Sequence, residues 1–100
     1  MPLCTFYTSS PQALSDGSRF RQSAPFVASR VYPLGTRLRL VNPATGRALT
    51  VTVRDRTAPG RMNLDLPRSC FGLLSKGHYL LGVLHLRVRV LSRPPRRTRR

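Results

Sequence analysis

Three segments of this 100-residue chain alternate apolar with polar residues, and this alternation constrains the fold more than any other feature. The segments are 36–40, 48–54 and 84–90. In a β-strand successive side chains point to opposite faces, so a period of two indicates a strand with one buried face. The connector 42–46 reads Asn-Pro-Ala-Thr-Gly, whose Pro and Gly favour a turn. The first two segments are therefore predicted to form a hairpin.

The remaining segments predict fewer elements. Residues 1–35 are rich in Ser, Pro and Gly, which predicts one short strand from Leu3 to Tyr7 and then a long ordered loop. A short amphipathic helix, with Pro67 in its first turn, is predicted by four apolar residues at helical spacing: Leu66, Cys70, Phe71 and Leu74. Because strands dominate and closure removes exposed strand edges, we expect a small β-barrel with one short helix.

The two ends of the chain carry little that could enter a core. Residues 93–100 combine Arg, Pro and Thr, so we expect a domain over 1–92 followed by a disordered Arg/Pro-rich tail. The start lacks the basic and apolar regions of a secretion signal. No apolar run reaches about 18 residues, so no membrane span is expected. We expect a monomer.

The charge balance excludes several kinds of site. The chain has 18 Lys+Arg and 3 Asp+Glu, a formal net charge of +15. A carboxylate cage for a metal would consume nearly all of the acidic residues. The 2 Cys and 2 His lack the paired spacing of a zinc site. We therefore expect no metal and no cofactor, and we interpret His78 and His85 as surface residues.

The positive charge favours an anionic partner. Candidates are cell-wall polymers, an acidic membrane surface and nucleic acid. Arg87 and Arg89 share one face of a predicted strand, Arg37 and Arg39 could adjoin them, and the tail 93–100 could hold phosphates without sequence specificity. The sequence contains neither a recognition helix nor an interleaved aromatic ladder. Nucleic-acid or polyanion binding through this basic face is retained as an alternative function.

Several motifs occur in one order that resembles a known family. Residues 32–40 resemble L-P-F-G-T-x-V-x-V, and 42–46 resemble N-x-x-x-G. Residues 51–56 resemble V-x-V-x-D-R-G-P, and 61–66 resemble G-R-x-x-D-L-S. Upstream, 15–20 resemble A-S-G-E-R-F. These are motifs of the RlpA-like (rare lipoprotein A) family, and the resemblance covers roughly residues 5–91. Expansins and barrel-type endoglucanases share its fold.

The resemblance implies a six-stranded double-psi β-barrel that acts outside the cytoplasm on a polysaccharide, usually peptidoglycan. The family's enzymes are lytic transglycosylases, in which a carboxylic acid protonates the glycosidic oxygen and the sugar's own 6-hydroxyl closes a ring. The resemblance implies that Asp65 is the general acid. It implies that Tyr7, Thr8 and Asp55 contact the substrate. No metal or cofactor is implied.

Two positions depart from the family pattern. The family's Asp in R-F-D corresponds to Arg21, and its His in T-A-A-H corresponds to Ser29. Both belong to the active groove of the transglycosylases, so cleavage and non-lytic, expansin-like binding stay open as alternatives.

The residues alone allow other roles for these side chains. Asp65 could satisfy free N–H groups at the start of the predicted helix, and the surrounding positive charge should lower its pKa. Asp55 could form an ion pair with a neighbouring Arg, and Asp16 is expected to be a turn residue beside Gly17. Cys4 and Cys70 could form a disulfide or remain two buried thiols.

Overall fold

The structure is a computed structural model that describes residues 2–7, 13–19 and 25–94. It is mainly β with one short α-helix, as predicted. Along the chain the elements are β1 (Leu3–Phe6), β2 (Phe26–Ala28), β3 (Arg37–Asn42), β4 (Arg47–Asp55), β5 (Leu64–Leu66), α1 (Arg68–Ser75), the 3₁₀ turn η1 (Tyr79–Leu81), β6 (Leu84–His85) and β7 (Arg87–Ser92).

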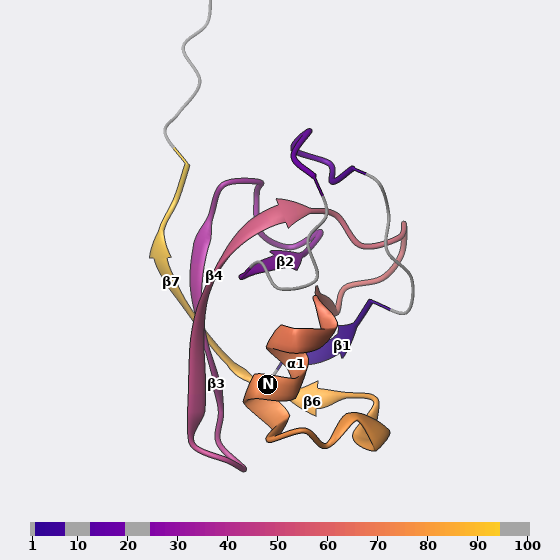
Figure 1. Ribbon diagram of the computed structural model, residues 1–100. Coiled ribbons are helices and arrows are strands. Elements are labelled where there is room, and N and C mark those ends of the chain that lie inside the picture. Colours follow the sequence, from indigo (N-terminus) through magenta and orange to yellow (C-terminus); the bar gives the residue numbers. More distant parts are fainter. Residues whose placement is uncertain (1, 8–12, 20–24, 95–100) are drawn as a thin grey trace, which may run out of the picture.

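The strands form one curled sheet in the order β6-β1-β5-β2-β4-β3-β7. The pairs β1–β5 and β2–β4 are parallel, and the other pairs are antiparallel. The two edge strands, β6 and β7, are separated along the chain by Leu86 alone. The chain itself therefore joins the two edges of the sheet into a barrel-like wall (Figure 1).

This join explains the difference between the predicted and the observed number of strands. The alternation over 84–90 predicts one continuous strand, whereas the structure divides it at Leu86 into β6 and β7. The N–H of Leu86 donates to the carbonyl of Pro2, 3.0 Å away. Before Leu86 the chain pairs with β1, and after it the chain pairs with β3. Counted as one bent strand, β6 and β7 give the expected six.

The hairpin of β3 and β4 follows from the alternation. Leu38 and Leu40 are buried, and they pair in register with Val51 and Leu49 of β4. The turn closes through the N–H of Gly46, which donates to the carbonyl of Asn42 at 2.8 Å. Gly46 has φ +74°, a left-handed conformation that glycine adopts without steric cost.

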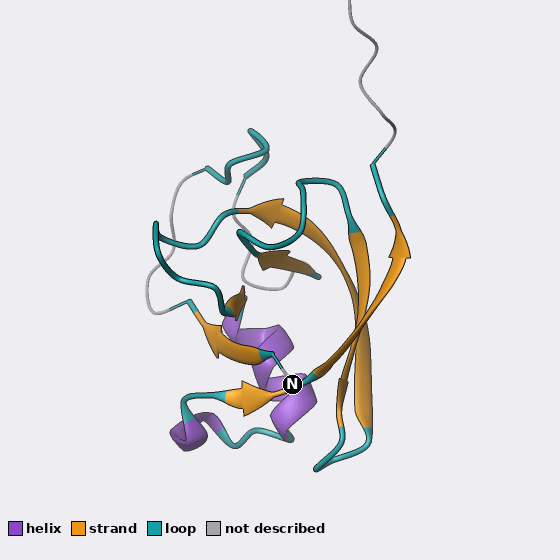
Figure 2. Ribbon diagram, turned by 180° about the vertical axis from the view of Figure 1, so that it is seen from behind, coloured by secondary structure: helices purple, strands orange, loops and turns teal. Residues whose placement is uncertain are grey.

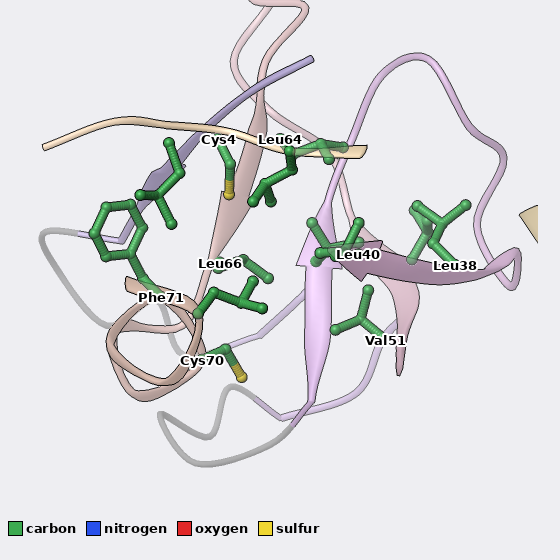
Figure 3. Packing of buried hydrophobic residues seen from close by; sticks show 13 residues of the cluster. Cys4, Leu38, Leu40, Val51, Leu64, Leu66, Cys70 and Phe71 are labelled. Atoms are coloured by element: carbon green, nitrogen blue, oxygen red, sulfur yellow. The ribbon is translucent and has the colours of Figure 1, made fainter. Parts of the chain in front are cut away.

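The core lies between the curled sheet and α1 (Figures 2 and 3). Its buried residues come from β1 to β6, from the helix and from Leu86 between β6 and β7: Cys4, Val27, Leu38, Leu40, Val51, Val53, Leu64, Leu66, Cys70, Phe71, Leu74, Leu84 and Leu86. Val88 and Val90 of β7 are partly buried and pack against them. Helix α1 lies in front of β1 and packs against β1, β3, β4 and β5 (Figure 1). The apolar periods predicted from the sequence thus meet in one core.

Three boundaries differ from the sequence prediction. Strand β2 lies within the stretch that was predicted to be loop. Leu66 belongs to β5 rather than to the helix, and Pro67 is the N-cap rather than part of the first turn. Most of the predicted tail, residues 95–100, lies outside the described residues, and so does Thr8. Among the described residues no helix is long and apolar enough to cross a membrane.

The two cysteines are separate buried thiols. Figure 3 shows the sulfur atoms of Cys4 and Cys70 apart from each other, on β1 and α1. Burial raises the pKa of the Cys4 thiol, and nearby Asp65 adds to the effect. The thiols therefore remain protonated and act as small apolar groups in the core.

Candidate functional site

Four residues form a row across four neighbouring strands. Thr5 of β1 pairs with Asp65 of β5, Asp65 pairs with Ala28 of β2, and Ala28 pairs with Asp55 of β4. Leu64 and Leu66, on either side of Asp65, point into the core, so the row lies on the outer face of the sheet. We call Thr5, Asp65, Ala28 and Asp55 the carboxylate row.

A β-bulge determines which residue of β4 joins this row. The register of β2 on β4 shifts between Val27 and Ala28, so that Val27 pairs with Val53 but Ala28 pairs with Asp55. In an unshifted register Ala28 would lie opposite Arg54. A bulge re-aims side chains in this way. The bulge therefore places the carboxyl group of Asp55 on one side of Ala28, and that of Asp65 lies on the other side.

Tyr7 closes the row on the side of β1. Its N–H donates to the carbonyl of Leu66 at 2.9 Å, which extends the β1–β5 ladder by one residue. Its hydroxyl donates to Asp55 Oδ2 at 2.6 Å, and its ring lies edge-on to Phe26 with 5.7 Å between centroids. The phenol thus reaches from β1 to the end of β4 and holds one carboxylate oxygen.

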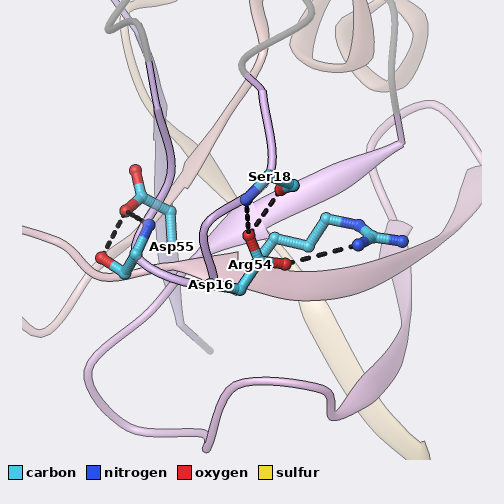
Figure 4. Close-up of polar contacts among 5 residues, drawn as sticks. Asp16, Ser18, Arg54 and Asp55 are labelled. Atoms are coloured by element: carbon cyan, nitrogen blue, oxygen red, sulfur yellow. Dashed lines mark hydrogen bonds and ion pairs between the residues drawn. The ribbon is translucent and has the colours of Figure 1, made fainter.

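The other oxygen of Asp55 is held by the loop that follows β1. Ser15 donates to Asp55 Oδ1 through its N–H at 2.9 Å and through its hydroxyl at 2.6 Å (Figure 4). Burial opposes ionisation of Asp55, but the hydrogen bonds from Ser15 and Tyr7 outweigh it and lower the pKa of the carboxyl group. Asp55 is therefore a fixed carboxylate rather than the ion-pair partner of an Arg.

Asp65 has the opposite character. Burial raises the pKa of its carboxyl group above the usual range, and the negative charge of Asp55 adds to this. The hydroxyl of Thr5, which donates to Asp65 Oδ1 at 3.1 Å, and the charge of Arg61 act against the shift without cancelling it. The expectation that the +15 charge would lower this pKa is wrong, because local desolvation outweighs the general field.

The helix-capping interpretation of Asp65 is also wrong. Helix α1 has no side-chain hydrogen bond at its N-cap, Pro67, and no acidic residue in its first turn. Asp65 instead lies within β5 and bonds to Thr5, whose hydroxyl also accepts a hydrogen bond from Asn63 Nδ2 at 2.9 Å. The chain Asn63–Thr5–Asp65 positions the carboxyl group from the β1 side.

Asp16 forms a separate polar cluster. It accepts hydrogen bonds from the N–H and the hydroxyl of Ser18 and lies 3.3 Å from Arg54 Nη1 (Figure 4). Gly17 between them has φ +88°, so the predicted turn is confirmed. Because Arg54 pairs with Asp16, this cation does not neutralise Asp55.

The structure brings three of the four predicted site residues together, namely Tyr7, Asp55 and Asp65. Thr8 and Arg21 lie outside the described residues. Ser29, at the position of the family's His, is fully buried, and its hydroxyl accepts hydrogen bonds from the N–H groups of Val31 and Tyr32. It stabilises a turn.

Sequence reasoning missed Thr5, Asn63, Ser15 and Ala28. Thr5 could have been found, because it alternates with Tyr7 on the predicted first strand. The others depend on register and on the bulge, which a single sequence does not specify. His78 and His85 are exposed, as expected.

Among the described residues no three His, Cys, Asp or Glu side chains lie together as a metal would require. A hollow of about 550 Å³ lies elsewhere, between the turn after β3, the end of α1 and the loop before β6. Its lining contains His78, His85 and Lys76 but no carboxylate. The carboxyl groups of Asp55 and Asp65 therefore lie at the carboxylate row and not in this hollow.

Comparison of the sequence with known proteins finds a relative of limited coverage. No family model matches the chain. The uncharacterized protein ssl3177 of Synechocystis sp. is 36% identical over 58 residues, which are 58% of this chain and 61% of that protein. The chain thus matches less than two thirds of that relative's length.

A solved structure gives the fold more directly. Cerato-platanin 3 from M. perniciosa superposes with a TM-score of 0.69 over 90% of this chain and 93% of its own, at 13% sequence identity. At this identity the likeness shows the fold alone. The protein therefore has a small barrel fold related to that of a cerato-platanin, in agreement with the class of barrel expected from the motifs. Membership of the RlpA-like family remains a prediction.

Proposed function

We propose that the chain is a cell-wall glycan-binding barrel, acting outside the cytoplasm, that binds peptidoglycan strands along the carboxylate row. One observation carries the proposal: the sheet register places the half-buried Asp55 and Asp65 on either side of the small, buried Ala28. Carboxylate oxygens accept hydrogen bonds from sugar hydroxyls, and Tyr7 offers an aromatic surface beside them. The predicted contact of Thr8 with the substrate stays a prediction, because this residue lies outside the described residues.

Sedimentation with purified peptidoglycan sacculi tests this proposal. The sacculi should first be treated with hydrofluoric acid, which removes phosphodiester-linked polymers and leaves the glycan. We expect the wild type to sediment, and we expect Asp55→Asn and Asp65→Asn to remain in the supernatant at the same salt concentration.

Asp16→Asn is the matched control, because it removes the same charge from a carboxylate outside the row. It should sediment like the wild type. Equal sedimentation of all four proteins, or of none, would contradict binding at the carboxylate row.

A second candidate function is cleavage of the bound strand by transglycosylation. The observation that favours it is the raised pKa of Asp65 beside the lowered pKa of Asp55. Two carboxyl groups with opposite shifts are the pattern of a general acid beside a fixed carboxylate. Asp65 would give its proton to the glycosidic oxygen as the bond between this oxygen and the anomeric carbon breaks. The sugar's 6-hydroxyl would attack the anomeric carbon, close a 1,6-anhydro ring and pass its proton to the Asp65 carboxylate, which restores the acid.

Analysis of the soluble products separates the two functions. Release of anhydro-muropeptides by the wild type and by Asp16→Asn, but not by Asp65→Asn, would establish cleavage with Asp65 as the acid. Sedimentation without anhydro products would leave a non-lytic binder.

A further inference from the structure

Four arginines lie on one exposed face of the sheet, away from the carboxylate row. Arg39 of β3 and Arg89 of β7 are directly opposite each other in the antiparallel register. Arg37 and Arg87 follow at the alternate positions of the same strands and are also exposed. We call these four residues the arginine strip: Arg37, Arg39, Arg87 and Arg89.

The strip is unfavourable for the isolated fold. Like charges at directly opposed positions of a sheet destabilise the pairing. All three acidic residues of the chain are described, and the only ion pair that the described residues form joins Arg54 to Asp16. Asp55 and Asp65 belong to the carboxylate row on other strands. Among the described residues no carboxylate forms an ion pair with the strip.

We propose that the arginine strip binds the backbone phosphates of a flexible poly(alditol phosphate) chain of the cell wall. Guanidinium groups bind phosphate oxygens through paired N–H donors, which makes Arg well suited to this ligand. Alternate residues of one strand are about 6.8 Å apart, so the strip offers two parallel rows of evenly spaced donors. A flexible polymer with one phosphate in every repeat can follow such a row.

The surroundings of the strip favour this polymer over nucleic acid. Single-stranded nucleic acids bind protein surfaces through bases stacked on aromatic rings as well as through phosphates. The residues that face the strip from β4 are Thr50 and Thr52, and the remaining position on β3 is Val41, so this face has no aromatic ring among the described residues. The choice of a wall polymer rests on the proposed function at the cell wall.

Binding to a synthetic glycerol phosphate oligomer tests the proposal. We expect the wild type to bind with an affinity that falls steeply with salt, with a slope of log K against log salt of about −3 for four phosphate contacts. Arg39→Gln/Arg89→Gln should weaken binding at least tenfold and roughly halve this slope. Because it removes two opposed like charges, this variant should also unfold at a higher temperature than the wild type.

Arg47→Gln/Lys76→Gln is the matched control, since it lowers the net charge equally. Arg47 lies opposite Asn42, a residue that points to the other side of β3, and Lys76 caps α1. This control should bind like the wild type. An equal loss of affinity in both variants would overturn the proposal in favour of binding by diffuse positive charge. No binding by the wild type would show that the strip is not a binding site for this polymer. Tighter binding to a DNA duplex or to oligo(dT) would overturn it in favour of nucleic acid.

The two proposals can fail separately. Sacculi treated with hydrofluoric acid lack the phosphate polymer, so they report on the carboxylate row alone. The glycerol phosphate oligomer lacks the glycan, so it reports on the arginine strip alone.

Discussion

At the scale of single residues, different environments shift the pKa values of Asp55 and Asp65 in opposite directions. Asp55 receives hydrogen bonds from Ser15, from Tyr7 and from the backbone N–H of Arg56, and these stabilise its charged form. Asp65 receives one from Thr5, and its burial disfavours the charged form. A base-like and an acid-like carboxyl group thus arise from one residue type, because only one of them has enough donors to offset burial.

Tyr7→Phe isolates the hydrogen bond from the phenol to Asp55. Its loss should raise the pKa of Asp55 and reduce the free energy of unfolding by about 1 kcal/mol, a common value for one hydrogen bond. Carbon-detected NMR titration of the Asp carboxyl groups and urea unfolding measure the two effects. The pKa of Asp16, which bonds to Ser18 and Arg54, serves as the internal control. An unchanged pKa of Asp55 would refute the role given to Tyr7.

Asp65→Asn tests the raised pKa through its linkage to stability. A carboxyl group with a raised pKa in the folded state binds more protons when folded, so the stability of the wild type falls as pH rises from about 3.9 to that raised pKa. The Asn variant lacks this fall. Its stability relative to the wild type should therefore increase as the pH rises from about 3.5 to about 7, a range that spans the titration of Asp.

Asp55→Asn should give the opposite trend. Urea unfolding of both Asn variants measures it when the pH series extends well below roughly 3.9, because the change for Asp55 lies there. The pKa of Asp55 is lowered in the folded state, so the wild type gains stability as pH rises from that lowered pKa to about 3.9. The same sign of pH dependence in both variants would contradict the assignment of the two carboxyl groups.

At the scale of elements, α1 is fitted closely to the segment that follows it. A Cβ at Gly72 would lie 2.6 Å from Tyr79 Cζ, so the helix carries glycine where the ring of η1 crosses it. The ring of Tyr79 stacks on Phe71, and the guanidinium carbon of Arg68 lies 4.8 Å from its centroid. Glycine weakens a helix interior by about 1 kcal/mol, and the packing against Tyr79 explains why this helix carries one.

Gly72→Ala should therefore destabilise the protein despite the better helix propensity of Ala. Overpacking costs about 1–3 kcal/mol, which exceeds the gain of about 1 kcal/mol that Ala has over Gly in a helix. In a Tyr79→Leu background the clash is absent, so the same substitution should become stabilising. Urea unfolding of the two single variants and the double variant measures this change of sign. Stabilisation by Gly72→Ala in both backgrounds would contradict the packing argument.

The elements also show how far a single sequence can be interpreted. The hairpin of β3 and β4 and the strand segment formed by β6 and β7 were predictable, because alternation over five or more residues indicates both the element and its buried face. Strand β2 was missed, because all three of its residues are buried and three residues carry no period. Strand β5 was missed for the same reason of length.

For the candidate site, the sequence predicted which residues take part but not their environments. Tyr7, Asp55 and Asp65 came from motifs, and the structure brings them together. Their chemistry depends on burial, on the bulge beside Ala28 and on donors such as Ser15, all of which are properties of the tertiary structure. Composition pointed to the wrong sign for the pKa of Asp65, because a net charge does not describe the desolvation of one group.

At the scale of the whole molecule, the fold carries a net charge of +15 with one ion pair among its described residues. Self-repulsion of this kind destabilises a compact state and is screened by salt. Between about 10 mM and about 150 mM salt the Debye length falls from roughly 30 Å to 8 Å. The melting temperature should therefore rise over this range by a few degrees, on the order of 1 kcal/mol of stability for a chain of this size.

Calorimetry in sodium chloride measures this rise, and phosphate at equal ionic strength adds a comparison. Phosphate should stabilise the wild type more than chloride does, and this excess should shrink in Arg39→Gln/Arg89→Gln. A melting temperature that falls or stays constant with salt would show that the positive surface does not strain the fold.

The central claim is that glycan strands bind along the carboxylate row, and chemical-shift mapping tests it most directly. ¹⁵N-labelled protein would be titrated with a soluble, phosphate-free peptidoglycan oligosaccharide. We predict that the largest amide shift changes occur in β1, in β5 and at the end of β4 near Asp55, and that Asp65→Asn reduces them. Shift changes confined to the arginine strip or to the hollow near His78, or no changes at all, would contradict the claim.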